Sequence, residues 1–409
     1  VKCSRDMKAI KAAVEKWYRD NDTKMKLTKT GLIATDREQL TDTDHPGLHA
    51  VADSVKTEKL LTTYVSALYR GTEVPMNPNY NSIIETFRTS CSGGMKIDGI
   101  PMGMNVQNLP RGGRVRECVI PRQGWVFGFC DFDTLEMRTL AQVCLHLFGF
   151  SALADAVHEG LDFHSAMAAD MLKVPYRDFM AKLKTGDKEY KNARQGCKIA
   201  NYGMAGGMGW STFIKYAKGF GVIVDADLAQ RLHGQFRNKW IEMPHYFRHI
   251  SYLCREGRAE KFIFPITGMY RGNVSYTAGC NSPFQHLAAK GAKMSVYEVA
   301  RECYVDAGSP LFSCRPFLFA HDEIGMEIPY DAIGPKAAHE AMVRLEQIMV
   351  ECMKHWCPDV PIAASGFMAR RWYKGADPVY QKGIMVPSKP VVIGKDAKGY
   401  DIIEWQADL

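Results

Sequence analysis

The sequence lacks the long apolar runs, the internal repeats and the leader-like start that would assign it to several common classes. No apolar run approaches the roughly 18 residues that a membrane-spanning helix needs. The N-terminal residues 1–17 are charged and amphipathic, unlike a secretory signal, and no segment recurs along the chain. We therefore expect a soluble protein that makes no use of a membrane.

Paired cysteines and a strong charge bias are also missing. The 12 cysteines stand singly, without a CxxC pair, which argues against a disulfide framework or a zinc site and favours reduced thiols, mostly in the core. Lys and Arg total 52 against 45 Asp and Glu, and the net charge of +7 permits a polyanionic partner without requiring one. The 409 residues can form one large domain with subdomains, or two to three domains.

Hydrophobic periodicity predicts both helices and strands. Helical spacing of apolar residues covers 8–18, 56–68, 135–147, 165–172, 187–205, 225–240, 286–307 and 331–356. Apolar runs predict strands at 125–132, 316–320 and 324–328. Residues 77–114 are rich in Gly, Pro, Asn and Ser and indicate loops around short strands, and the tail after Trp372 is rich in Pro and Gly. The fold class is mixed α and β.

Two of the predicted strands end on carboxylates. Asp131 closes the strand at 125–132, and Asp322 lies in the polar triplet 321–323 between two strands. If the fold brings the two aspartates together, they offer hard oxygen ligands for two Mg²⁺ ions and an in-line phosphoryl displacement. The alternative is that each aspartate caps a strand or a turn, which is the commoner role for a lone residue.

The predicted helix at 187–205 carries a stripe of cations. Arg194, Lys198 and Tyr202 follow at i, i+4 and i+8, so that two cations and an aromatic ring share one helix face. Such a stripe suits a triphosphate and a base, although a solvated basic face is the alternative. Asn281 and Gln285 are spaced i, i+4, so both amides could face a DNA minor groove or simply the solvent.

In their order along the chain, these segments resemble the family A DNA polymerases, and most closely the bacteriophage members. Residues 131–138 (Asp-Phe-Asp-Thr-Leu-Glu-Met-Arg) are similar to the first family motif, a catalytic Asp followed five residues later by Glu. Residues 194–203 resemble the fingers helix that faces the nucleotide, and His321-Asp322-Glu323 resembles the third motif. Further segments that resemble the family, in the expected order, are 28–31, 106–110, 162–164 and 281–285.

The resemblance implies a catalytic centre with two metal ions. Asp131 and Asp322 would bind two Mg²⁺ ions, for which Mn²⁺ can substitute, with the backbone carbonyl of Phe132 as a further ligand. Glu323 would lie beside the ions, and Lys198 would act as a general acid toward the leaving pyrophosphate.

The resemblance also implies how the nucleotide is held. Arg194, Lys198 and His164 would bind the triphosphate, while Tyr202 would stack on the nascent base pair. A tyrosine at this position implies tolerance of dideoxynucleotides. Glu136 would be a steric gate that leaves no room for a 2′-hydroxyl.

Other positions are implied to contact DNA, and one position departs from the family. The residues expected at primer-template DNA are Gln107, Asn108, Asn281, Gln285, His321 and Arg88. Gly206 stands where the family usually has a tyrosine that hydrogen-bonds the gate glutamate. The departure makes gate geometry and fidelity the properties most affected.

The implied fold is the α+β polymerase right hand, with an antiparallel palm sheet, mostly helical fingers and a partial or reduced helical thumb. We expect residues 1–75 to form the partial thumb and its connection to the palm, 76–148 the first palm segment, 149–265 the fingers, and 266–409 the second palm segment and the tail. The short stretch before residue 28 leads us to expect no full thumb and no proofreading domain in this chain.

These features predict a template-directed DNA polymerase that extends a primer 3′ end with deoxynucleoside triphosphates and releases pyrophosphate. We expect primer-template DNA and deoxynucleoside triphosphates as partners, and a monomer in the cytoplasm, that of a bacterial host if the protein comes from a phage. One alternative is a single-subunit RNA polymerase, which Glu136 and Glu323 disfavour. The other is a non-catalytic primer-template binding protein, which Asp131, Asp322 and Lys198 disfavour.

Overall fold

The computed structural model describes residues 6–23, 25–28, 30–94, 96–97, 100–101, 103–110, 114–255, 257–395 and 401–408. One residue of the segments that resemble the family, Lys29, lies outside the described residues. The chain divides into two compact units, one formed by Val1–Asn79 with Gly93–Met104, the other by Tyr80–Ser92 with Asn105–Leu409. Among the described residues, no helix is both long and apolar enough to cross a membrane.

The first unit is mainly helical. Its elements are α1 (Met7–Asp20), α2 (Arg37–Thr41), the helical run α3 (Pro46–Lys59), η1 (Leu60–Val65) and α4 (Ser66–Arg70), and the short strands β3 (Lys96–Ile97) and β4 (Ile100–Pro101). Helix α1 begins where the Asp6 carboxylate accepts hydrogen bonds from two backbone N–H groups. The buried residues that pack together here are Val14, Tyr18, Leu40, Leu48 and Ala52. The predicted helix at 56–68 is therefore part of a longer run that starts at Pro46, because proline fits the first helical turn.

The second unit is built around a six-stranded sheet with the order β14-β13-β10-β5-β9-β8. Its strands are β5 (Val126–Phe132), β8 (Arg315–Ala320), β9 (Glu323–Ile328), β10 (Ala364–Ala369), β13 (Ser388–Lys395) and β14 (Asp401–Ala407). All neighbours pair antiparallel except β10 and β13, which run parallel. The apolar run around β5 is thereby explained, since this strand lies inside the sheet with partners on both sides.

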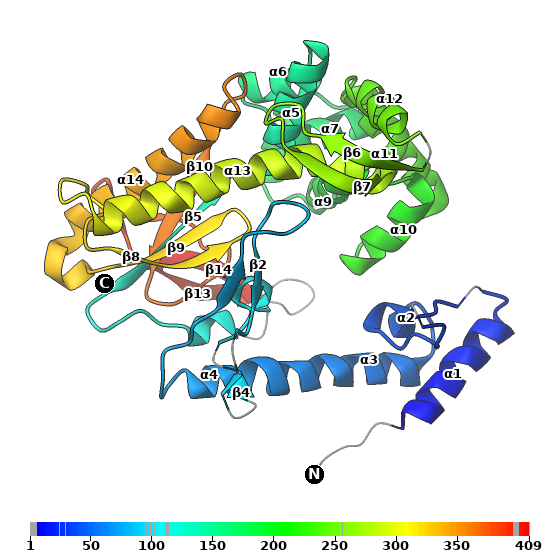
Figure 1. Ribbon diagram of the computed structural model, residues 1–409, viewed down its shortest axis with the longest axis horizontal. Helices are drawn as coiled ribbons and strands as arrows, with labels where there is room; N and C mark the ends of the chain where they lie inside the picture. Colours follow the sequence, from blue (N-terminus) through cyan, green and yellow to red (C-terminus); the bar gives the residue numbers. More distant parts are fainter. Residues whose placement is uncertain are drawn as a thin grey trace. The chain divides into compact units, whose positions relative to one another are not determined.

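Two long helices cover one face of this sheet, as Figure 1 shows. They are α13 (Tyr276–Tyr304) and α14 (Tyr330–Trp356). A Cβ added at Gly128 of β5 would lie 2.5 Å from Met342 Sδ, so this glycine lets α14 approach the strand closely. Because side chains alternate along a strand, Phe127, Phe129 and Asp131 point to the opposite face.

The remaining helices of the second unit gather near one end of α13 (Figure 1). They are α5 (Leu135–Phe148), α6 (Ala152–His158), α7 (Phe163–Leu172), α8 (Tyr176–Lys184), α9 (Lys188–Ala205), α10 (Trp210–Gly219), α11 (Ala226–Lys239) and α12 (Met243–Leu253). The short elements are η2 (Val106–Asn108), η3 (Arg116–Cys118) and the strand pairs β1 (Asn79–Asn81) with β2 (Ser90–Ser92), β6 (Arg258–Ile263) with β7 (Tyr270–Ser275), and β11 (Val379–Gln381) with β12 (Ile384–Val386). All described cysteines are free thiols, and all but Cys118 are buried.

The elements confirm the mixed α and β class and correct some boundaries. Helix α13 begins ten residues before the predicted start at residue 286, because the Ser275 side chain caps it and Pro283 is accommodated inside it. Helices α6, α8, α10 and α12 were not predicted. The Pro- and Gly-rich tail after Trp372, for which no strand was predicted, forms β11 to β14.

Candidate active site

A cleft with a volume of about 1020 Å³ opens in the second unit, where β5 and β9 meet helices α5, α7 and α9. Every predicted site residue except Asn281 and Gln285 lines it. The predicted residues in its lining are Arg88, Gln107, Asn108, Asp131, Phe132, Glu136, His164, Arg194, Lys198, Tyr202, His321, Asp322 and Glu323. Segments distant in the sequence thus converge on one cavity large enough for a nucleotide.

The three acidic residues are brought together by strand register. Strands β5 and β9 pair antiparallel with Asp131 directly opposite Glu323. Asp322 lies in the tight turn between β8 and β9, where His321 takes a left-handed φ of 64°. Asp131 and Asp322 both line the cleft, and Asp322 directly precedes Glu323, so the fold brings the two aspartates to one place.

The electrostatics of these carboxylates fit a divalent cation. Burial, followed by the charge of Asp131, raises the pKa of Asp322 well above its usual range. Asp131 Oδ1 is buried without a hydrogen-bond partner among the described residues. No group of three or more His, Cys, Asp or Glu side chains in the described part of the chain forms a ready metal centre. The two carboxylates are oxygen donors of the kind that Mg²⁺ prefers, and such an ion would complete its shell with water and substrate oxygens.

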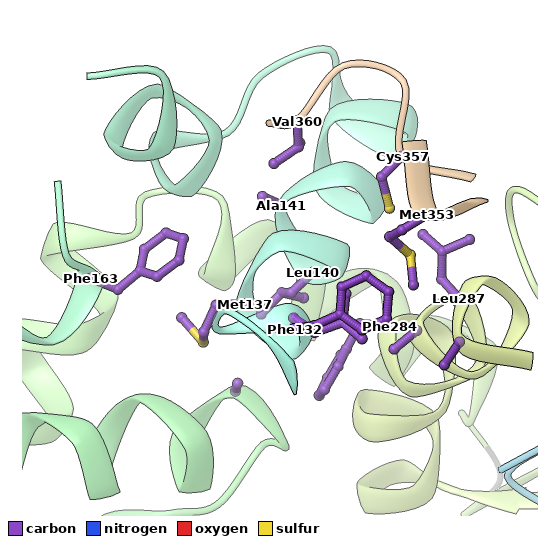
Figure 2. Packing of buried hydrophobic residues seen from close by; sticks show 14 of the residues in the cluster. Phe132, Met137, Leu140, Ala141, Phe163, Phe284, Leu287, Met353, Cys357 and Val360 are labelled. Atoms are coloured by element: carbon purple, nitrogen blue, oxygen red, sulfur yellow. The ribbon is translucent and has the colours of Figure 1, made fainter. Parts of the chain in front are cut away.

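The side chain of Phe132 points away from the carboxylates. It packs with Met137, Leu140 and Phe284 in the buried cluster shown in Figure 2. Its main chain meanwhile continues β5 past Asp131 and lines the cleft. A buried ring thus anchors the strand end that carries the first aspartate.

Lys374 is a site residue that sequence reasoning missed. Its ammonium group donates to Asp131 Oδ2 at 3.1 Å and also forms an ion pair with Glu323. The lysine is placed by Trp372, whose indole stacks on Phe129 with a ring-centroid distance of 6.1 Å. Neither periodicity nor a motif identified Lys374 in the sequence. Its position beside the carboxylates depends on how the segment after β10 packs.

Helix α9 presents the predicted cationic stripe to the cleft. The Arg194 guanidinium makes two hydrogen bonds to Asp162, at 3.1 and 3.0 Å, and a third to Ser165. Burial alone would raise the pKa of Asp162, but the hydrogen bonds from Ser165 and Arg194 outweigh it and hold the pKa below its usual value. Lys198 is exposed, and no described residue forms an ion pair with it. Arg194 is thus fixed in orientation, whereas Lys198 is available to a ligand.

Tyr202 completes the stripe and lies near the carboxylates. Burial raises the pKa of its phenol to about 12, and the negative charges of Asp322, Asp162 and Asp131 add to this effect. Its ring lies 5.3 Å from that of His164. The aromatic, the cations and the acidic residues therefore share one space.

The hydrogen bonds around His164 assign its proton to one ring nitrogen. Burial lowers its pKa to about 4. Trp240 donates to Asn201 Oδ1 at 3.0 Å, which leaves the Asn201 amide nitrogen to donate to His164 Nδ1, also at 3.0 Å. His164 Nδ1 is therefore an acceptor, and Nε2 carries the proton without a partner among the described residues. Neither Trp240 nor Asn201 was singled out from the sequence.

Glu136 and Arg88 form an ion pair in the cleft. Glu136 lies in the first turn of α5, where the helix dipole favours a carboxylate. Burial lowers the pKa of Arg88, and the nearby charge of Asp322 opposes this change. Arg88 was predicted only as a DNA contact, so its link to Glu136 is new.

The amide side chains that were predicted to contact DNA differ in their burial, their hydrogen bonds and their position relative to the cleft. Gln107 is buried and donates to Thr89 Oγ1 at 3.0 Å and to the Phe319 carbonyl at 3.2 Å. Asn281 donates to the Thr277 carbonyl at 2.9 Å and to the Gly206 carbonyl at 3.4 Å. Asn281 and Gln285 do not line the cleft. A contact of these amides with DNA stays a prediction.

Comparisons with known proteins agree with this geometry. The family model for DNA polymerase family A matches residues 13–374. DNA polymerase I of Chloroflexus aurantiacus is 26% identical over 306 residues, covering 71% of this chain and 29% of the relative. DNA polymerase I of Mycobacterium leprae is 25% identical over 364 residues, covering 85% of this chain and 36% of the relative. The thermostable DNA polymerase I of Thermus aquaticus is 25% identical over 325 residues, covering 75% and 34%.

A solved structure shares the fold. The POL domain of Pol1 from M. smegmatis, in complex with DNA primer-template and dNTP, is 22% identical with a TM-score of 0.61, covering 89% of this chain and 66% of that one. This likeness confirms the α+β polymerase fold. The chain spans about a third of the length of the curated relatives that it matches. Since the family model covers most of its length, the chain belongs to DNA polymerase family A.

Proposed function

We propose that this chain carries out template-directed DNA synthesis, adding deoxynucleoside triphosphates to a primer 3′ end and releasing pyrophosphate. The observation that carries the proposal is the shared cleft, in which Asp131, Asp322 and Glu323 lie with the α9 stripe. The relatives named DNA polymerase I, and the neighbour bound to primer-template and dNTP, support it.

The acidic residues are proposed as the metal site. Asp131 and Asp322, with the Phe132 carbonyl, would hold two Mg²⁺ ions, and Glu323 would lie beside them. When bound, such ions make the primer 3′-hydroxyl a better nucleophile and stabilise the leaving oxygen. The paired strands β5 and β9 place Asp131 opposite Glu323, with Asp322 in the turn directly before β9.

The triphosphate is proposed to lie along α9. Lys198 is the exposed cation of the stripe and would bind the phosphates and donate a proton to the leaving pyrophosphate. Arg194 would present its fork in the orientation that Asp162 fixes. His164 would add a neutral N–H donor from Nε2, which suits a phosphate oxygen.

Selection of the nucleotide is assigned to Tyr202 and Glu136. Tyr202 would stack on the nascent base pair, and tolerance of dideoxynucleotides stays a prediction for it. Glu136 would exclude the 2′-hydroxyl of a ribonucleotide. Gln107, Asn108 and His321 line the cleft on its sheet side and are proposed, with Asn281 and Gln285, at the primer-template.

Several finer predictions remain proposals. The six-stranded sheet is the proposed palm, residues 149–265 the proposed fingers and residues 1–75 the proposed partial thumb. The boundary at 265 falls between β6 and β7, which pair as one hairpin. We propose polymerisation without proofreading for these residues, a monomer, and a location in the cytoplasm. The phage-type assignment also stays a prediction, since the relatives named above are bacterial.

Primer extension tests the proposal directly. The protein is given a DNA primer-template and Mg²⁺, with deoxynucleotides in one reaction and ribonucleotides in another. We expect template-dependent extension with deoxynucleotides. Extension with ribonucleotides alone would favour an RNA polymerase instead. Tight primer-template binding without any extension would favour the non-catalytic binding protein.

A further inference from the structure

We propose that Arg88 is the positioning residue of the sugar gate: it holds the Glu136 carboxylate in place, a task for which α9 offers no side chain at Gly206. The inference rests on the proposed role of Glu136 in excluding ribonucleotides. It assigns to Arg88 an action on sugar selection in place of a direct contact with DNA.

The contact itself is suited to orienting a carboxylate. The Arg88 guanidinium forms an ion pair with Glu136, and their side chains are 31% and 27% exposed. Among the described residues, Arg88 is the sole ion-pair partner of Glu136. A planar guanidinium fixes the direction of a carboxylate better than a lysine does, and partial burial makes the pair stronger than an exposed one.

The backbone on both sides of Arg88 is anchored. Phe87 takes a left-handed φ of 60° and packs its ring on His286 and Phe264, with centroid distances of 4.6 and 5.6 Å. Thr89 accepts a hydrogen bond from Gln107 at 3.0 Å, and Gln107 also binds the main chain of β8 through Phe319. Arg88 therefore extends from a fixed point toward Glu136.

Gly206, the C-cap residue of α9, offers no side chain that could hold the Glu136 carboxylate. A Cβ added at Gly206 would lie 2.6 Å from Asn281 Nδ2 and 2.7 Å from Asn281 Oδ1. Asn281 is itself tied to α13 and to the Gly206 carbonyl. A side chain at Gly206 would require the Asn281 amide to move, whereas Arg88 already forms an ion pair with Glu136.

A double-mutant cycle tests the inference. Sugar discrimination is the ratio of kcat/KM for a deoxynucleotide to kcat/KM for the matching ribonucleotide, measured for wild type, Arg88→Ala, Glu136→Ala and the double variant. We expect Arg88→Ala to lower the ratio by about tenfold, the scale of one lost charge-assisted hydrogen bond. In the Glu136→Ala background, removal of Arg88 should change the ratio by less than about twofold, because Arg88 acts through Glu136.

Two further variants separate positioning from folding. Arg88→Lys keeps the charge but not the planar fork and should restore only part of the discrimination. Arg344→Ala removes a matched arginine, ion-paired with Glu302 outside the cleft, and should lower the melting temperature without changing the ratio.

The other outcomes are distinct. If Arg88→Ala lowers kcat/KM for both sugars equally, Arg88 acts on DNA and the inference is overturned. A higher discrimination ratio in Arg88→Ala would also overturn the inference, since the ion pair with Arg88 would then hold Glu136 away from the sugar. If wild type extends no primer, the proposed function itself fails. If Glu136→Ala leaves the ratio unchanged, the proposed role of Glu136 fails, and the inference about Arg88 is overturned with it.

Discussion

The two sides of the cleft differ in how far apart along the chain their neighbouring residues are. On one side, Asp131 and Glu323 face each other because β5 and β9 pair in a fixed register between distant parts of the chain. On the other side, Arg194 and Lys198 share a face because they lie one helical turn apart on α9. The sheet side concentrates negative charge in a partly buried place, and the helix side offers an exposed cation.

The difference shows what each side requires of a ligand. The carboxylates repel one another, and a lysine, Lys374, partly neutralises them. The helix needs no such compensation, since Arg194 is already paired with Asp162 and Lys198 remains open. We therefore expect changes on the sheet side to act through metal ions and changes on the helix side to act through the triphosphate.

The largest effect is expected on the sheet side. Asp131→Asn should lower kcat for primer extension by about 10³-fold, because a charged ligand is removed from a preorganised site. The affinity for primer-template should change by less than about twofold, since phosphate contacts are untouched. Fluorescence anisotropy with labelled duplex measures that affinity in the same preparation. Activity close to wild type would contradict the assignment.

A smaller loss is expected on the helix side. Lys198→Ala should lower kcat/KM for a deoxynucleotide by about 10²-fold, from loss of a phosphate contact and a general acid. Lys191→Ala is the matched control, because this exposed lysine lies on the same helix outside the cleft. If Lys198→Ala and Lys191→Ala lower kcat/KM equally, the loss comes from the reduced positive charge of α9 and not from a contact specific to Lys198.

The smallest effect is expected from the lysine that links the carboxylates. Lys374→Met should raise the affinity for Mn²⁺ by about tenfold, since a competing cation is removed from partly exposed acidic groups. Electron paramagnetic resonance of free Mn²⁺ reports binding without any turnover. Lys389→Met, which breaks the ion pair with Asp408 elsewhere, should leave the affinity unchanged. A lower affinity in Lys374→Met would show that the lysine supports the site instead.

This difference in separation along the chain also explains which parts of the site could be predicted from the sequence. Helical spacing predicted the stripe from Arg194 to Tyr202, and the apolar run predicted the strand that ends near Asp131. Register across the sheet carries no local signal, so the meeting of Asp131 with Asp322 needed the fold. Lys374 was missed for a similar reason: its position depends on the stacking of Trp372.

The ion pair between Arg88 and Glu136 could not be predicted from the sequence either. The two residues lie on separate elements, and Arg88 sits in a loop whose course depends on packing of Phe87 against distant rings. Gly206 did signal, from the sequence alone, that the gate differs from the family pattern. The ion pair between Arg88 and Glu136 became visible only with the loop in place.

A crystal structure with primer-template, an incoming deoxynucleotide and Mn²⁺ tests the central claim most directly. Anomalous scattering should place two Mn²⁺ ions roughly 2.0–2.2 Å from carboxylate oxygens of Asp131 and Asp322. The triphosphate should contact Lys198, with Lys374 withdrawn from the carboxylates. Absence of anomalous density at the two aspartates, or a triphosphate bound away from α9, would contradict the account.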